Sequence, residues 1–156
     1  MHLHLIAVGK RMPAWVAAGF QDYARRLPSP WALRLTEIPP VNRTSGKAAR
    51  DYMREEGERV QRACPEDAYL VVLDERGKDW NSKQLSQRLQ RWSQDGRDVA
   101  FIIGGADGVD AALKKCADEL WSLSPLTLPH ALARVVVAEQ IYRAWSLLSN
   151  HPYHRD

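Results

Sequence analysis

The last residues of the chain carry four side chains that can accept a proton, stack on a flat ring or bind an anion. His151, Tyr153, His154 and Arg155 lie within five residues of one another, next to the end of the sequence. A polar terminus usually frays in solvent. The same side chains can also place a proton acceptor, a stacking ring and a phosphate or base donor beside one nucleotide. The residues alone leave both interpretations open.

A second candidate is a cluster of glycines. Gly104, Gly105 and Gly108 directly follow the apolar residues Phe101 to Ile103. If that run is a buried strand, the glycines lie at the carboxyl edge of a sheet, where open α/β sheets bind ligands. Their spacing matches neither the dinucleotide-binding nor the triphosphate-binding glycine pattern. A plain tight turn explains the cluster equally well.

Two further segments change character where an apolar run ends. Leu73 to Lys78 turns abruptly to charged residues, which is typical of a solvated loop at the same edge of the sheet. Leu123 to His130 is largely apolar and contains Pro125 and Pro129. Because so apolar a loop should not be left in water, we expect it to pack in the core or to form the wall of a pocket for a flat, mostly apolar ligand part.

Elements that position these segments follow from the alternation of apolar runs with helical patterns, which is typical of a parallel sheet covered by helices. Within the helical pattern that follows Asn81, leucine and tryptophan recur at helical spacing, Asn81 or Ser82 can cap the start, and Gly96 can end it. The predicted strands are 2–8, 32–38, 69–73, 99–103 and 120–123, and the predicted helices are 13–26, 47–63, 82–95, 110–117 and 131–149.

The last predicted helix, 131–149, is apolar over much of its circumference. Such a helix must be buried on more than one side. The second side is either another subunit or a deep groove of the same chain. Glu139 and Arg143, four residues apart in the favourable order, are expected to form an ion pair.

The composition limits the class of protein and the number of domains. The chain has 156 residues, 45% of them apolar and 26% charged, which suits one globular domain over 1–156. Its net charge of +3 does not by itself indicate nucleic-acid binding. Basic clusters such as Arg43 with Lys47 and Arg50 are interpreted as solvated faces, and Pro39 to Gly46 as a mobile loop. The apolar runs are too short to cross a membrane, and the spacing of Cys64 and Cys116 favours reduced thiols in the cytosol without a metal.

Taken together and in this order, the segments resemble the ribosomal RNA large subunit methyltransferase H family, a minimal member of the SPOUT methyltransferases. The similarity covers essentially the whole chain, and its C-terminal third is the most specific part. The matching residues are Leu73-Asp74, Gly77-Lys78, Ile102 to Gly105 with Gly108, Leu123-Ser124 through His130, Arg134-Val135, Glu139 to Ala144, and Pro152 to Arg155.

The resemblance implies an α/β SPOUT fold with a C-terminal trefoil knot, a homodimer, and S-adenosylmethionine held by loops of that knot. It also implies methylation of a pseudouridine at N3 in large-subunit ribosomal RNA of the assembled ribosome, in the cytoplasm. The cofactor residues that it implies are Leu73, Gly104, Leu123, Ser124, Pro125, Leu126, Thr127 and Leu128. At Ala106-Asp107 the sequence departs from the Pro-Glu type of pair in the family, which puts the role of the Asp107 carboxylate in doubt.

The N3 atom of a pseudouridine carries a proton that must leave, so the enzyme must position and deprotonate the base. His154 is the first candidate for a base or proton relay, Tyr153 for stacking or orienting the ring, and Arg155 for holding phosphate or stabilising the imide anion. Arg143 and His130 are second-rank candidates, alongside structural roles as an ion-pair partner and a polar residue at a helix start. We expect one subunit to supply the cofactor loops and the other the tail.

Two rival functions fit the residues less well. One is a noncatalytic ribosome-binding or assembly module, which predicts RNA binding without a cofactor. The other is a different nucleotide-using α/β enzyme of flavodoxin-like build.

Overall fold

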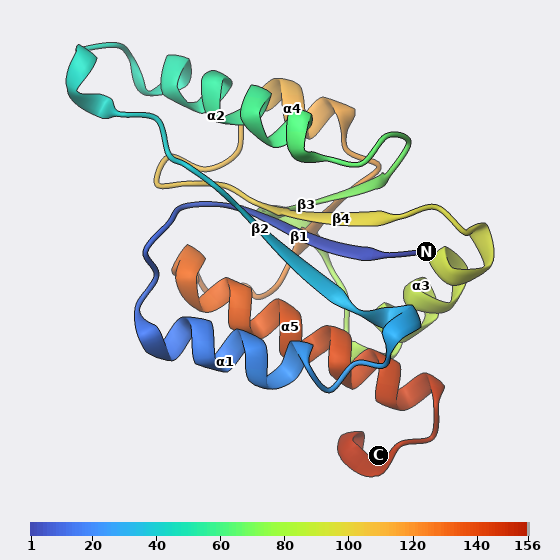
Figure 1. Cartoon of the computed structure of the whole chain (residues 1–156). Coiled ribbons are helices and arrows are strands. Elements are labelled where there is room, and N and C mark those ends of the chain that lie inside the picture. Colours follow the sequence, from blue (N-terminus) through green and yellow to red (C-terminus); the bar gives the residue numbers. More distant parts are fainter. Residues whose placement is uncertain (156) are drawn as a thin grey trace.

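A computed structural model describes residues 1–155 and shows a parallel sheet between two layers of helices (Figure 1). The five strands lie in the order β2-β1-β4-β3-β5. Their bounds are β1 (Leu3–Val8), β2 (Leu33–Ile38), β3 (Tyr69–Asp79), β4 (Val99–Ile103) and β5 (Glu119–Ser122). All four pairings between neighbouring strands are parallel, which confirms the predicted α/β class.

Within residues 1–155, five helices cover the sheet. They are α1 (Ala14–Ala24), α2 (Ala49–Ala63), α3 (Ser82–Asp95), α4 (Ala111–Cys116) and α5 (His130–Leu148). Three short 3-10 turns, not predicted from the sequence, are η1 (Ser29–Trp31), η2 (Arg43–Ser45) and η3 (Pro152–His154). Helices α1, α3 and α5 pack on one face of the sheet, and α2 and α4 on the other.

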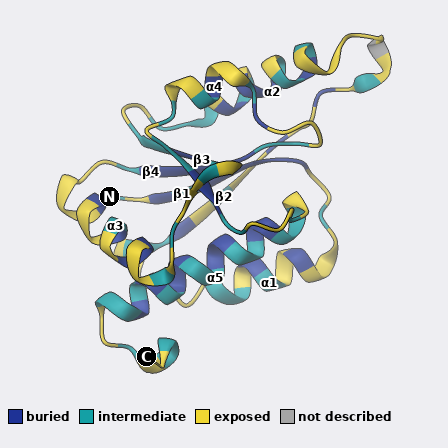
Figure 2. Ribbon diagram, turned by 180° about the vertical axis from the view of Figure 1, so that it is seen from behind, coloured by how far each residue is buried: buried dark blue, intermediate teal, exposed yellow. Residues whose placement is uncertain are grey.

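Alternation along the central strands divides the core in two. In β1, Leu5 and Ala7 face the side of α5, whereas Ile6 and Val8 face the side of α2. Successive side chains of a strand point to opposite faces, so a strand covered on both sides is apolar throughout. Figure 2 shows this as buried strands between helices whose outer surfaces are exposed.

Helix α3 begins and ends where its sequence predicts. The Asn81 side chain accepts a hydrogen bond from the backbone N–H of Gln84, and the Gln84 side chain accepts one from the N–H of Asn81. This reciprocal capping satisfies donors that the first turn leaves open. Gly96 ends the helix with a φ of 85°.

Helix α5 lies between α1 and α3 against the sheet, with Val137, Ala138, Ile141 and Ala144 fully buried. Its burial on more than one side is therefore confirmed, and the groove of its own chain accounts for it. The predicted partner subunit stays a prediction. Along the outward side, Leu132, Val136 and Leu147 are half-buried.

Strand β3 differs most from its prediction. It continues from Leu73 through the charged residues to Asp79, and its register against β5 shifts between Leu73 and Lys78. The sequence did not predict this extension of β3, because the charged residues show no alternation with apolar ones. Strand β5 begins and ends one residue earlier than predicted.

The trefoil knot stays a prediction, as does the single domain over 1–156, whose last residue lies outside the described residues. Over 1–155, no helix is long and apolar enough to cross a membrane.

Candidate functional site

A cavity of about 650 Å³ lies at the carboxyl edge of the sheet, beside the ends of β4 and β5 and the second half of β3. The glycine loop after β4 forms one side, and the loop between β5 and α5 forms another. Met53 from α2 and Trp121 from β5 complete the walls, and neither was predicted from the sequence.

The glycine loop is a turn too narrow for a side chain at its first position. A Cβ atom added to Gly104 would lie 2.7 Å from the carbonyl carbon and oxygen of Gly108. The N–H of Gly108 donates to the oxygen of Gly105 at 3.1 Å, and Gly108 has a φ of 90°. Gly104 is thus required by the close approach of the loop to itself.

The irregular part of β3 provides the opposite rim. The carboxylate of Asp74, 8% exposed, lies 2.6 Å from Nζ of Lys114 and accepts a hydrogen bond from the N–H of Arg76. Burial acts to raise the pKa of Asp74, but these two hydrogen bonds outweigh it and lower the pKa below its ordinary value. Because a Cβ at Gly77 would lie 2.6 Å from the carbonyl carbon of Leu120, only glycine lets β3 approach β5 this closely.

The apolar loop before α5 forms a wall of the cavity, as one of the two predictions for it stated. Its shape depends on serine hydroxyls, since Ser122 donates to the oxygen of Ser124 and Ser124 accepts from the N–H of Leu126, both at 3.0 Å. Thr127 donates to Glu75 at 3.3 Å and so links the wall to the rim. Leu126 is 72% exposed at the cavity.

Most of the predicted cofactor residues meet in this cavity. Leu73, Gly104, Leu123, Ser124, Leu126, Thr127 and Leu128 line it, together with His130. Pro125 is exposed and is not among the lining residues.

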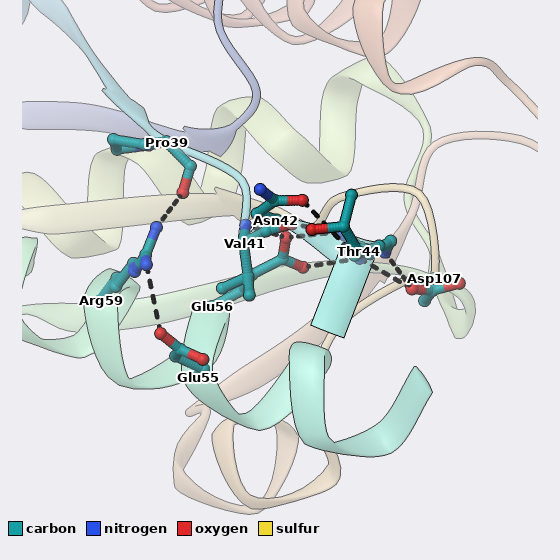
Figure 3. A network of polar contacts seen from close by, with 9 residues as sticks. Pro39, Val41, Asn42, Thr44, Glu55, Glu56, Arg59 and Asp107 are labelled. Atoms are coloured by element: carbon teal, nitrogen blue, oxygen red, sulfur yellow. Dashed lines mark hydrogen bonds and ion pairs between the residues drawn. The ribbon is translucent and has the colours of Figure 1, made fainter. Parts of the chain in front are cut away.

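Asp107, whose role the sequence left in doubt, lines the cavity and binds Arg43. Figure 3 labels Asp107 within a network of polar contacts around the segment before α2. The interpretation of Arg43 as part of a solvated face was wrong, since its side chain is 32% exposed and bonded to two carboxylates. Those carboxylates are 13 and 64 residues away in sequence, so local spacing gave no signal of the pairing.

The C-terminal tail packs against the second half of α5. The Tyr153 hydroxyl donates to Glu139 at 2.9 Å, and the predicted Glu139–Arg143 ion pair is present at 2.6 Å. The guanidinium of Arg143 lies 5.0 Å from the centre of the Tyr153 ring, and Nδ1 of His154 lies 3.2 Å from the hydroxyl of Ser146. Burial, followed by the hydrogen bond to Glu139, raises the pKa of the Tyr153 phenol and keeps it neutral.

The two groups of predicted residues lie at opposite ends of α5 within the chain. His130, its first residue, lines the cavity, whereas the tail follows its last turn (Figure 1). At about 1.5 Å per residue, Ser146, which contacts His154, lies roughly 24 Å along the helix from His130, and Glu139, which contacts Tyr153, lies roughly 14 Å from it. Arg155 is exposed at the far end.

Comparison with known proteins shows the family to which this chain belongs. A family model described as "Predicted SPOUT methyltransferase" matches residues 1–154. Proteins named "Ribosomal RNA large subunit methyltransferase H" from Paraburkholderia phymatum and Paraburkholderia xenovorans are 54% and 55% identical over 155 residues, covering 99% of each chain. The protein of that name from Burkholderia thailandensis is 52% identical over the same length. The chain belongs to the ribosomal RNA large subunit methyltransferase H family of SPOUT methyltransferases.

A solved structure supports the fold of this SPOUT methyltransferase. The crystal structure of a probable methyltransferase from Bordetella pertussis Tohama I superposes with a TM-score of 0.57 over 91% of this chain and 95% of that one. At 14% identity the similarity concerns the fold alone. Within the described part of the chain, no cluster of histidine, cysteine or acidic residues has an arrangement that could hold a metal ion.

Proposed function

We propose that this SPOUT methyltransferase uses S-adenosylmethionine to methylate N3 of a pseudouridine in large-subunit ribosomal RNA of the assembled ribosome. The observation that carries the proposal is the meeting of seven of the eight expected cofactor residues in one cavity at the ligand-binding edge of the sheet. The names of the similar full-length proteins support the choice of large-subunit RNA as the substrate.

The cavity suits the proposed cofactor in size and chemistry. Its volume of about 650 Å³ lies within the usual range of small-molecule sites. Leu123, Leu126 and Leu128 offer apolar contacts to a flat ring, and the backbone of the glycine loop offers polar groups without side chains in the way. The Glu75 carboxylate, which lines the cavity beside Arg76, could face the positive charge of the cofactor. When bound, S-adenosylmethionine would supply an electrophilic methyl group on a positively charged sulfur.

The tail residues provide the groups that handle the base. His154 accepts the N3 proton directly or through a relay, because an imidazole exchanges protons near neutral pH. Tyr153, held neutral beside Glu139, serves to stack on or orient the base and does not act as the base itself. Arg155 and Arg143 offer positive charge to phosphate or to the imide anion.

A twofold dimer brings these groups to the cofactor. His154 docks at Ser146, roughly 24 Å along α5 from His130 at the cavity of its own chain. If two copies of α5 pack antiparallel across a twofold axis, each tail lies beside the partner's cavity. The half-buried apolar residues on the outward side of α5 supply a surface for that contact. We therefore propose a homodimer with two composite sites.

Calorimetric titration with S-adenosylmethionine, S-adenosylhomocysteine, ATP and flavin mononucleotide tests the cofactor. We expect only the first two to bind. Ribosomes from cells that lack this methyltransferase, incubated with the protein and S-adenosylmethionine, should gain one methyl group on a pseudouridine, detected by mass spectrometry of digested RNA. Ribosome binding without any cofactor binding would instead favour an assembly module.

A further inference from the structure

The guanidinium of Arg43 joins the segment before α2 to the glycine loop of the cavity, and Figure 3 labels its two carboxylate partners, Glu56 and Asp107. Nε and Nη2 of Arg43 donate to the same Asp107 oxygen at 2.9 and 2.7 Å. Nη1 and Nη2 donate to the two Glu56 oxygens, both at 3.2 Å, and Nη1 also donates to the carbonyl of Val41 at 3.0 Å. Arg43 therefore bridges a carboxylate on α2 and a carboxylate on the loop.

Glu56 is the fixed end of this bridge. Its side chain is 3% exposed, and it also accepts a hydrogen bond from the N–H of Val41 at 3.0 Å. A Cβ atom added to Gly105 would lie 3.2 Å from Oε1 of Glu56, so the carboxylate packs directly against the glycine loop. A buried carboxylate needs a cation or several donors, and Arg43 is the cation. The hydrogen bonds to Glu56 and Asp107 in turn raise the pKa of Arg43.

Asp107 is the end of the bridge that lies on the glycine loop. It lies between Gly105 and Gly108, whose backbones have more conformational freedom than those of other residues. Within this turn, one backbone hydrogen bond joins the N–H of Gly108 to the oxygen of Gly105. The ion pair adds a second restraint at the middle of the turn. The guanidinium makes four hydrogen bonds to the two carboxylates, whereas an ammonium has only three donors.

We propose that Arg43 is a positioning residue that holds the 104–108 loop in its ligand-binding shape by bridging Glu56 to Asp107. This inference rests on the proposed function, in which the loop binds S-adenosylmethionine. Arg43 itself is not among the residues that line the cavity, so it acts through Asp107.

Two variants cut the bridge in different places. Asp107→Asn removes the charge of the half-exposed end and leaves Glu56 paired with Arg43, so it should fold normally. Arg43→Lys keeps the charge but loses the planar fork. The double variant tests whether both changes act through one contact. Arg59→Ala is the matched control, because Arg59 of α2 also holds the segment, by donating to the carbonyl of Pro39 at 2.8 Å, and pairs with Glu55 on its own helix at 3.2 Å.

Two measurements follow the loop. Amide hydrogen exchange of Gly108 in the protein without cofactor should be about tenfold faster in Asp107→Asn and Arg43→Lys, and unchanged in Arg59→Ala. Calorimetry should show S-adenosylmethionine bound about tenfold more weakly by both variants, and the double variant should bind no more weakly than either. On ribosomes, KM for the cofactor should rise while kcat at saturation stays near the wild-type value.

The outcomes separate this inference from the proposed function. Wild-type exchange rates at Gly108 in both variants would overturn the positioning role whatever the cavity binds. Additive losses in the double variant, or an equal loss in Arg59→Ala, would also overturn it. If wild-type protein does not bind S-adenosylmethionine at all, the proposed function fails, and the exchange experiment still decides whether Arg43 holds the loop.

Discussion

At the scale of single residues, Gly104 and Gly105 are neighbours with different packing constraints. A methyl group at Gly104 would meet the Gly108 backbone at 2.7 Å, whereas one at Gly105 would meet side chains of Val8 and Glu56 at 3.1 and 3.2 Å. Backbone cannot give way without moving the loop, but side-chain atoms can shift by a few tenths of an ångström. The glycine loop therefore tolerates change at its second position better than at its first.

Gly104→Ala should therefore weaken cofactor binding at least about tenfold and lower the free energy of unfolding by about 1–3 kcal/mol, the usual range for overpacking. Gly105→Ala should do less of both. Calorimetry and urea unfolding of the two variants check the comparison. Normal cofactor binding by folded Gly104→Ala would show that this loop does not form the site.

Glu139 is the residue on which the tail depends. It accepts hydrogen bonds from Tyr153, Arg143 and Gln140. Glu139→Gln keeps the size but loses the charge, and charge-assisted hydrogen bonds are the stronger kind. We expect the tail to undock, seen as faster proteolysis after Tyr153, with activity reduced about tenfold and cofactor affinity unchanged. An equal loss of cofactor affinity would mean that the lesion spreads beyond the tail.

At the scale of elements, the Asp74 carboxylate, which lies in the irregular part of β3, makes the free energy of unfolding depend on pH. Asp74 has a pKa below its ordinary value because Lys114 and the N–H of Arg76 outweigh the effect of burial. The resulting stabilisation is complete above the ordinary aspartate pKa of about 3.9 and is lost as pH falls through the lower value of the folded state. Urea unfolding near pH 6 and near pH 3 should show a smaller loss for Asp74→Asn than for wild type, with exposed Glu66→Gln as control. Equal losses in Asp74→Asn and wild type would contradict the assignment.

The same elements show what a sequence can predict. Strands β1 and β4 and helix α3 follow from apolar periodicity and caps, which depend on near neighbours. The extension of β3 through Asp74 depends instead on pairing with β5, and the bridge of Arg43 to Asp107 spans 64 residues. Neither leaves a local pattern. The cavity residues were predicted through the resemblance, whereas Trp121 and Met53 became visible only when the elements were assembled.

At the scale of the whole molecule, charge and size limit how RNA can be held. A net charge of +3 gives little attraction for phosphates, and affinity for nucleic acid depends largely on such contacts. We expect methylation of ribosomes or large subunits and at least about tenfold less of the same RNA stripped of protein. Methyl incorporation from labelled S-adenosylmethionine measures both. Equal turnover on short naked transcripts would contradict this expectation.

The composite site depends on the dimer, because the cavity of one chain lies at the start of α5 and its tail follows the last turn. Two inactive variants test it. Leu126→Arg adds bulk and positive charge at the cavity and should fold, since Leu126 is 72% exposed. His154→Ala removes the proposed proton acceptor from the tail.

Mixing the two variants under conditions of subunit exchange should restore activity to about a quarter of wild type, since half of the dimers are then mixed and each has one intact site. The other site of a mixed dimer carries both lesions and stays inactive. If the tail instead served its own chain, every site in every dimer would carry one lesion and no activity would return. Native mass spectrometry establishes that mixed dimers have formed, so their inactivity would rule out a site shared between subunits.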